Sequence, residues 1–108
     1  MVDGVTGKAW SEEEVEVALE VYFRMFLWQV DGVEFSKRDL SNDVAAQLPA
    51  RSRKSIELKW CNVSAVLDEL GLAWVDGFRP MLNYQRSLKP AVEAWLEARP
   101  AISVRLGY

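Results

Sequence analysis

The fold is decided by the stretch from residue 36 to residue 71, which reads SKRDLSNDVAAQLPARSRKSIELKWCNVSAVLDELG. Ser36 and Ser52 each stand where a helix would begin, and serine there accepts a hydrogen bond from the first turn. Pro49 ends the first helix and Gly71 the second. The stretch therefore predicts a short helix, a turn of about three residues and a longer helix, which is the outline of a helix-turn-helix unit.

Apolar residues recur at helical spacing in both predicted helices and would give each of them one buried face. In the shorter helix they are Leu40, Val44 and Leu48, and in the longer one they are Ile56, Trp60, Val63, Leu67 and Leu70. Many helical bundles share this pattern. It therefore predicts a helical fold without indicating a function.

Further helices are expected on both sides of this unit. The capping box of residues 11–14 predicts a helix that continues to about Asp31 and ends at Gly32. Residues 72–80 contain an Asp-Gly turn signal and predict either a small β-hairpin or an irregular loop. Residues 83–99 are predicted to be helical. Pro90 would either kink this helix or stand in the first turn of a new one that begins with Ser87 as its cap.

The expected fold class is mainly α, with four to five helices around a helix-turn-helix, winged-helix-like core. A hairpin near residues 72–80 would be the wing. The chain has 108 residues, half of them hydrophobic, which suits a single domain with one core. We expect a flexible arm over residues 1–9, the helical domain over 10–99 and a tail or linker over 100–108.

The composition argues against an enzyme. The chain has no histidine, which excludes Ser-His-Asp and Cys-His catalysis, and its single cysteine excludes a thiolate zinc site. The acidic run at residues 12–14 is explained by the helix start, where carboxylates are favoured, rather than by a metal. We expect no metal and no cofactor. The lone cysteine, the lack of a secretory signal and the lack of a long apolar run predict a cytoplasmic protein that does not bind membranes.

The net charge of −3 conceals a strong asymmetry along the chain. Residues 1–50 carry ten acidic and four basic side chains, whereas residues 51–89 carry four acidic and seven basic ones. A localised basic segment on an acidic protein can still bind phosphate groups, with a strong dependence on salt. We therefore place the functional surface within residues 51–89.

Three blocks of sequence carry a resemblance to a known family. They are Ser55 to Leu72 (SIELKWCNVSAVLDELGL), Asp76 to Pro80 (DGFRP) and Asn83 to Arg86 (NYQR). Together with Trp10-Ser11-Glu12-Glu13-Glu14 and Arg51-Ser52, they resemble an N-terminal module of bacterial HNH-type restriction endonucleases, including McrA-like enzymes that cleave modified DNA. The resemblance covers about residues 10–98. It implies a DNA-binding domain that senses modification such as methylation, with the nuclease in another part of the full-length protein.

The candidate site residues follow from the charge pattern and from this resemblance. Arg51, Arg53 and Lys54 open the longer helix, as the N-terminal residues of a recognition helix do. Ser55 and Asn62 are candidates for reading bases, and Lys59 for contacting a phosphate. The second basic block comprises Arg79, Asn83, Tyr84, Arg86 and Lys89, and its first four residues are the candidates for contacting DNA. The alternative is that the basic residues are solvated surface charges, that Tyr84 fills core space and that Asn62 bonds a neighbouring loop.

The chain has five tryptophans, which raises the idea of an aromatic cage for a methylated or flipped base. Trp28, Trp60 and Trp95 lie on or near apolar stripes and are expected in the core, which leaves Trp74 as the candidate cage wall. The expected function is double-stranded DNA binding. The alternative is a protein–protein interaction module or homodimer formed through the acidic first helix or an exposed tryptophan.

Overall fold

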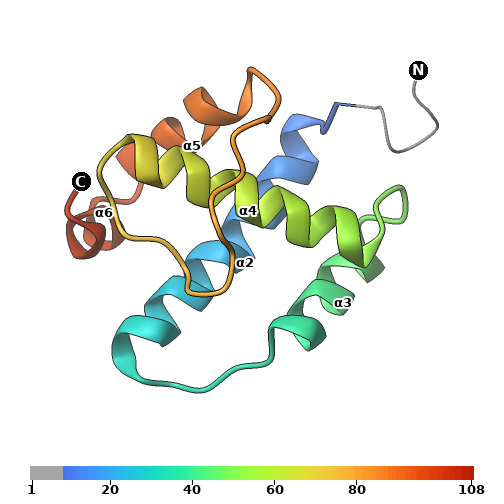
Figure 1. Cartoon of the computed structure of the whole chain (residues 1–108), viewed down its shortest axis with the longest axis horizontal. Helices are drawn as coiled ribbons and strands as arrows, with labels where there is room; N and C mark the ends of the chain where they lie inside the picture. The colour runs from blue at the N-terminus through green and yellow to red at the C-terminus, as the bar shows by residue number, and fades with distance from the viewer. Residues whose placement is uncertain (1–8) are drawn as a thin grey trace.

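The computed structural model describes residues 9–108, and in that part of the chain it contains five helices and no strand (Figure 1). The helices are α2 (Glu12–Asp31), α3 (Lys37–Gln47), α4 (Arg53–Glu69), α5 (Leu88–Glu97) and α6 (Pro100–Leu106). The predicted mainly helical fold class is confirmed. The arm expected over residues 1–9 lies, apart from Ala9, outside the described residues.

The first helix begins and ends as its sequence predicts. The Ser11 hydroxyl accepts from the Glu14 backbone N–H at 3.1 Å, and the Glu14 carboxylate accepts from the Ser11 N–H at 2.9 Å, so the capping box is formed. Gly32 ends α2 with φ of 73°, a left-handed conformation that glycine adopts without steric cost.

Helices α3 and α4 also begin at their predicted caps. The Ser36 hydroxyl accepts from the Asp39 N–H and the Ser52 hydroxyl from the Ser55 N–H, both at 3.1 Å. A short turn joins the two helices, and α3 packs against α4. The predicted succession of short helix, turn and long helix is therefore present.

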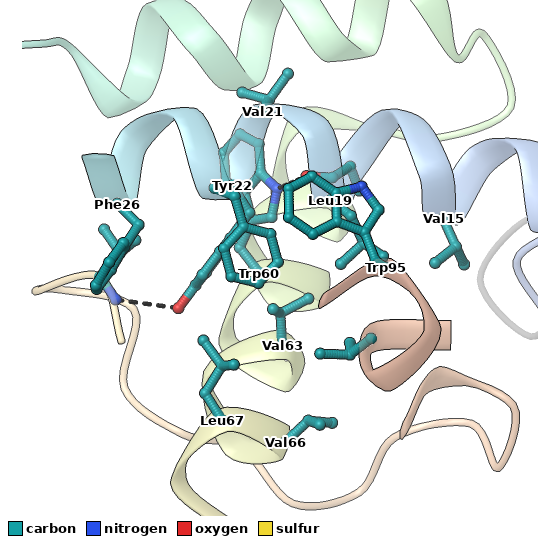
Figure 2. Close-up of a cluster of buried hydrophobic side chains, with 14 of the residues drawn as sticks. Val15, Leu19, Val21, Tyr22, Phe26, Trp60, Val63, Val66, Leu67 and Trp95 are labelled. Atoms are coloured by element: carbon teal, nitrogen blue, oxygen red, sulfur yellow. Dashed lines mark hydrogen bonds between the residues drawn. The ribbon is translucent and has the colours of Figure 1, made fainter. Parts of the chain in front are cut away.

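Helix α4 is the central element, because it packs against α2, α3 and α5 (Figure 1). Large side chains from α2 and α4 meet in the core, as Figure 2 shows, and Trp95 joins them from α5. The largest fully buried side chains are Trp60, Tyr22, Phe23, Phe26, Leu19 and Met25. The apolar stripe predicted for α4 is thus its buried face.

Three polar bonds fix this core. The Trp60 indole N–H donates to the Ala18 carbonyl at 3.0 Å. The Tyr22 hydroxyl lies 2.7 Å from the Ser64 Oγ and accepts from the Val75 N–H at 3.0 Å (dashed in Figure 2). The bond from Val75 ties the loop after α4 onto the core. Residues 72–80 form no strand, so the irregular loop is the correct alternative and the hairpin wing is not formed.

The C-terminal part differs from the prediction in two places. Helix α5 begins at Leu88 rather than near Asn83, with Pro90 in its first turn, as the second alternative proposed. The predicted Ser87 cap is not formed: its backbone is helical (φ −76°, ψ −9°) rather than extended, and its hydroxyl accepts from the Gln85 side chain at 2.7 Å.

Residues 100–106, for which the sequence predicted a tail or linker and no helix, form α6, which packs against α5. The Ser103 hydroxyl donates to the Leu96 carbonyl of α5, and Leu106 is buried. A proline at the start and Gly107 at the end are ordinary helix boundary signals that the sequence prediction overlooked. Among residues 9–108, no helix combines the length and the apolar character that a membrane crossing requires.

Candidate nucleic-acid interface

The start of α4 presents two cations on its surface. Lys54 is exposed, and Arg53 is half-buried with a 3.2 Å ion pair to Glu57 one turn later. The Ser55 hydroxyl donates to the Ser52 carbonyl at 2.9 Å within the same turn. Arg53 and Lys54 are therefore placed as the prediction requires, whereas the hydroxyl proton of Ser55 is engaged by its own helix.

Arg51 faces the interior, unlike its two neighbours. Its guanidinium donates to both carboxylate oxygens of Glu14, at 2.9 and 3.1 Å, and to the Ala9 carbonyl at 2.8 Å. It also lies 4.9 Å from the centre of the Trp10 ring. A buried cation needs such partners because it has lost its water. The predicted phosphate contact by Arg51 is therefore not available in this conformation, and the residue instead joins α2 to the start of α4.

Lys59 is also withdrawn from the surface. Only 6% of the residue is exposed, and its ammonium lies 3.4 Å from the Gln85 Oε1 and 5.1 Å from the Trp10 ring centre. Burial, and then the charge of Arg51, lower the pKa of Lys59 to about 8, while Glu14 opposes the shift. The structure thus does not place Lys59 where a phosphate could reach it.

Asn62 contacts a neighbouring loop. Its amide donates to the Met81 carbonyl at 2.7 Å, and the Met81 N–H donates to the Cys61 carbonyl at 3.1 Å. These bonds hold the segment of residues 79–85 across the outer side of α4 (Figure 1). The loop contact that the sequence left as an alternative for Asn62 is therefore present, and this segment covers the middle of α4.

The second basic block is mostly exposed. Arg79, Asn83 and Arg86 are exposed, whereas Tyr84 is half-buried. The Tyr84 hydroxyl donates to Glu69 at 2.6 Å, and this bond raises its pKa to about 12. In residues 9–108, the side chains of Lys54, Arg79 and Arg86 make no ion pair and no hydrogen bond. Within residues 51–89, these three cations are the ones available to an anionic partner.

The sequence prediction missed Arg38 in the first turn of α3. It is exposed, and it stands one turn before Ser41, whose hydroxyl donates to Glu57 of α4 at 3.0 Å. Arg38 therefore flanks the start of α4. The available signal was an arginine in the first turn of the shorter helix of the predicted helix-turn-helix unit.

The tryptophans do not form an aromatic cage in the described part of the chain. Trp60 and Trp95 are buried, as expected, and Trp28 is half-buried against Phe35. Trp74 is half-buried in the loop after α4, and no ring within residues 9–108 stacks on it. Trp10, which the prediction did not single out, covers the buried Arg51 and Lys59.

In residues 9–108, no group of three Cys, Asp or Glu side chains is arranged to hold a metal ion. Cys61 is half-buried, and burial raises the pKa of its thiol, which keeps it protonated and unreactive near neutral pH.

Comparison of the chain with protein-family models, with curated proteins and with solved structures finds no match. The function therefore has to be inferred from the surface itself.

Proposed function

We propose that this chain is a double-stranded DNA-binding module that uses α3, the turn and α4 as a helix-turn-helix. The observation that carries the proposal is a set of exposed cations that make no ion pair or hydrogen bond within residues 9–108. Lys54 lies in the first turn of α4, and Arg79 and Arg86 lie at the two ends of the segment that crosses this helix (Figure 1). The first turn of a recognition helix is the part that meets the major groove, and arginine and lysine supply the phosphate contacts.

The residues proposed to contact DNA fall into two groups, cations that bind phosphates and an exposed amide. Lys54, Arg79 and Arg86 bind phosphates, with Arg38 and Arg53 at the edge of the same surface. Asn83 is exposed and keeps its amide for a base edge or a phosphate. The resemblance to the accessory domain of modification-dependent restriction endonucleases agrees with this proposal and favours a modified duplex as the ligand.

The salt dependence of binding tests the proposal quantitatively. Each neutralised phosphate contributes about −0.9 to the slope of log K against log salt concentration, so three contacts predict a slope of about −3. The measurement is fluorescence anisotropy of a labelled duplex across a salt series. A slope near zero, or no binding at low salt, contradicts the proposal.

Single substitutions give a matched comparison. Lys54→Ala should weaken binding to every duplex and reduce the magnitude of the slope by about 1. Arg24→Ala is the control, because Arg24 is an exposed cation of α2 that lies beside α5 and α6. An equal effect of both substitutions would show that only net charge matters. A panel of duplexes tested at one salt concentration then identifies the ligand. The panel comprises plain, hemimethylated, 5-methylcytosine, 6-methyladenine and phosphorothioate duplexes.

A protein–protein interaction module is the second candidate, because large apolar side chains are exposed near the same surface. Leu82 is 66% exposed, Met81 46% and Leu58 44%. None of the tryptophans in residues 9–108 is exposed, so these side chains, rather than an indole, would make the contact. Light scattering tests the dimer: a stable dimer that retards no duplex at low salt favours this function over DNA binding.

A further inference from the structure

A groove runs between α2 and α5, and no residue of the proposed DNA surface lines it. Its volume is about 580 Å³, and its walls include Trp10, Val15, Leu19, Ala91, Ala94 and Trp95. Binding sites for small molecules are typically apolar clefts of roughly 300–1,000 Å³ with a few polar groups. The groove therefore has the size and the lining of such a site.

One polar group in the wall has no partner. The Trp95 Nε1 is the only buried side-chain nitrogen or oxygen in residues 9–108 that makes no hydrogen bond. Phe23 stacks on Trp95 with ring centres 4.4 Å apart, and the Arg99 guanidinium lies 4.0 Å from the ring centre, so both faces of the indole are occupied. Figure 2 shows the ring nitrogen turned toward α2, on the side of Val15. Buried polar groups are normally bonded, so this N–H calls for an acceptor that the described residues do not supply.

The α5 wall leaves room for an occupant. Ala91, Ala94 and Ala98 line the groove at a spacing of three and four residues, which places them along one face of the helix. Ala94 and Ala98 are exposed, so this face of α5 is open to solvent. A ligand can therefore lie along the α5 wall and bring an acceptor to Trp95 once the flexible side chains at the rim move aside.

The rim of the groove is acidic. Glu12 and Glu16 line it and are exposed. Arg99 is the basic residue of the rim, and it is shared between Glu16 at 3.1 Å and Glu20 at 2.9 Å. One guanidinium between two carboxylates, with Glu12 beside them, leaves a net negative charge that favours a cation.

We propose that this groove binds a small, mainly apolar cation that also carries a hydrogen-bond acceptor, such as an aromatic amine. The apolar body lies on the alanines and Val15, the acceptor receives the Trp95 N–H, and the ammonium lies at the glutamate rim. This site goes beyond the proposed DNA binding and does not depend on it.

Three matched probes test this chemistry by ¹H–¹⁵N NMR titration of the full chain. The first, 6-(aminomethyl)quinoline, has both the ammonium and the acceptor nitrogen. The second, 2-(aminomethyl)naphthalene, lacks the acceptor. The third, quinoline-6-carboxylate, keeps the acceptor but carries a negative charge. The first should shift the Trp95 indole N–H and the amides of Val15 and Ala94 saturably. The naphthalene should bind about three- to tenfold more weakly, which is the value of one hydrogen bond. The carboxylate should bind about tenfold more weakly because of the rim.

Two variants locate the site. Ala94→Leu places a large side chain in the groove and should abolish binding, whereas Ala46→Leu, at an exposed alanine of α3, should leave it unchanged. In Trp95→Phe the preference for quinoline over naphthalene should disappear. The proposal is overturned if no probe gives saturable shifts, if all three bind equally, or if Ala94→Leu binds like the wild type.

Discussion

Replacement of Arg51 by alanine should destabilise the fold by about 3 kcal/mol. Breaking a buried ion pair by removing one partner costs about 3–5 kcal/mol, because the remaining charge loses its compensation. The side chain of Arg51 is 5% exposed and that of Glu14 is 18% exposed. Water can therefore partly reach the orphaned carboxylate, which places the cost at the low end of the range. A loss of this size is a large share of the 5–15 kcal/mol that stabilises a typical domain.

The same pair sets a dependence on pH. The hydrogen bond from Arg51 is the main cause that lowers the pKa of Glu14 in the folded chain. A carboxylate whose folded pKa is below its unfolded value stabilises the fold above the unfolded pKa, about 4.3 for glutamate, and this stabilisation is lost as the pH falls through the folded pKa. The wild type should therefore lose stability on acidification. Arg51→Ala should lose less stability on acidification, because without Arg51 the pKa of Glu14 is no longer lowered by this hydrogen bond.

Urea unfolding followed by tryptophan fluorescence, at neutral pH and in steps down to about pH 3, measures both effects. Arg53→Ala is the matched control. Its ion pair with Glu57 is about a third exposed on both sides, so it should cost less than about 1 kcal/mol. The reasoning is refuted if Arg51→Ala is as stable as Arg53→Ala. If Arg51→Ala keeps full stability and loses DNA binding, Arg51 belongs to the interface instead.

Three further substitutions probe the core and its edges by the same unfolding assay. Tyr22→Phe should cost about 1–3 kcal/mol, because Ser64 and the Val75 N–H lose their shared buried partner; a neutral effect would contradict this. Lys59→Met should stabilise the chain by about 1–3 kcal/mol at pH 7. The pKa of Lys59 falls from 10.5 to about 8 on folding, so wild-type stability should rise between these pH values as the buried charge is lost, and the variant should lack that rise. Leu106→Ala should cost about 2 kcal/mol if α6 is part of the fold, and nothing if residues 100–108 are a tail.

The helix boundaries could be predicted because their signals are local. The serines at residues 11, 36 and 52 accept hydrogen bonds from backbone N–H groups three residues later, so the sequence contains both partners of each bond. The start of α5 could not be fixed in this way. Gln85 bonds the Ser87 hydroxyl and the backbone of Trp10, which is 75 residues away in sequence, and only the folded chain brings them together.

The different roles of Arg51 and Arg53 likewise depend on contacts between residues that are far apart in sequence. Both precede or open α4 and carry the same charge, so the composition of this block treats them alike. Arg51 stands before the cap, where the docking of α2 decides which way its side chain points, and Glu14 is 37 residues away. Helical periodicity applies only within α4. It therefore gave the surface position of Arg53 and Lys54 and could not give the burial of Arg51.

The charge of residues 51–89 consequently overstates the positive surface that a partner meets. Of its seven basic side chains, Arg51 and Lys59 are buried, and Arg53 and Lys89 pair with glutamates. If the chain binds DNA as proposed, phosphate attraction from the remaining three would give only weak binding to any duplex at physiological salt, because each contact is screened. Discrimination among duplexes would then have to come from contacts with base edges. The exposed amide of Asn83 is the best-placed group of the predicted site for such a contact, because the amide of Asn62 already donates to Met81.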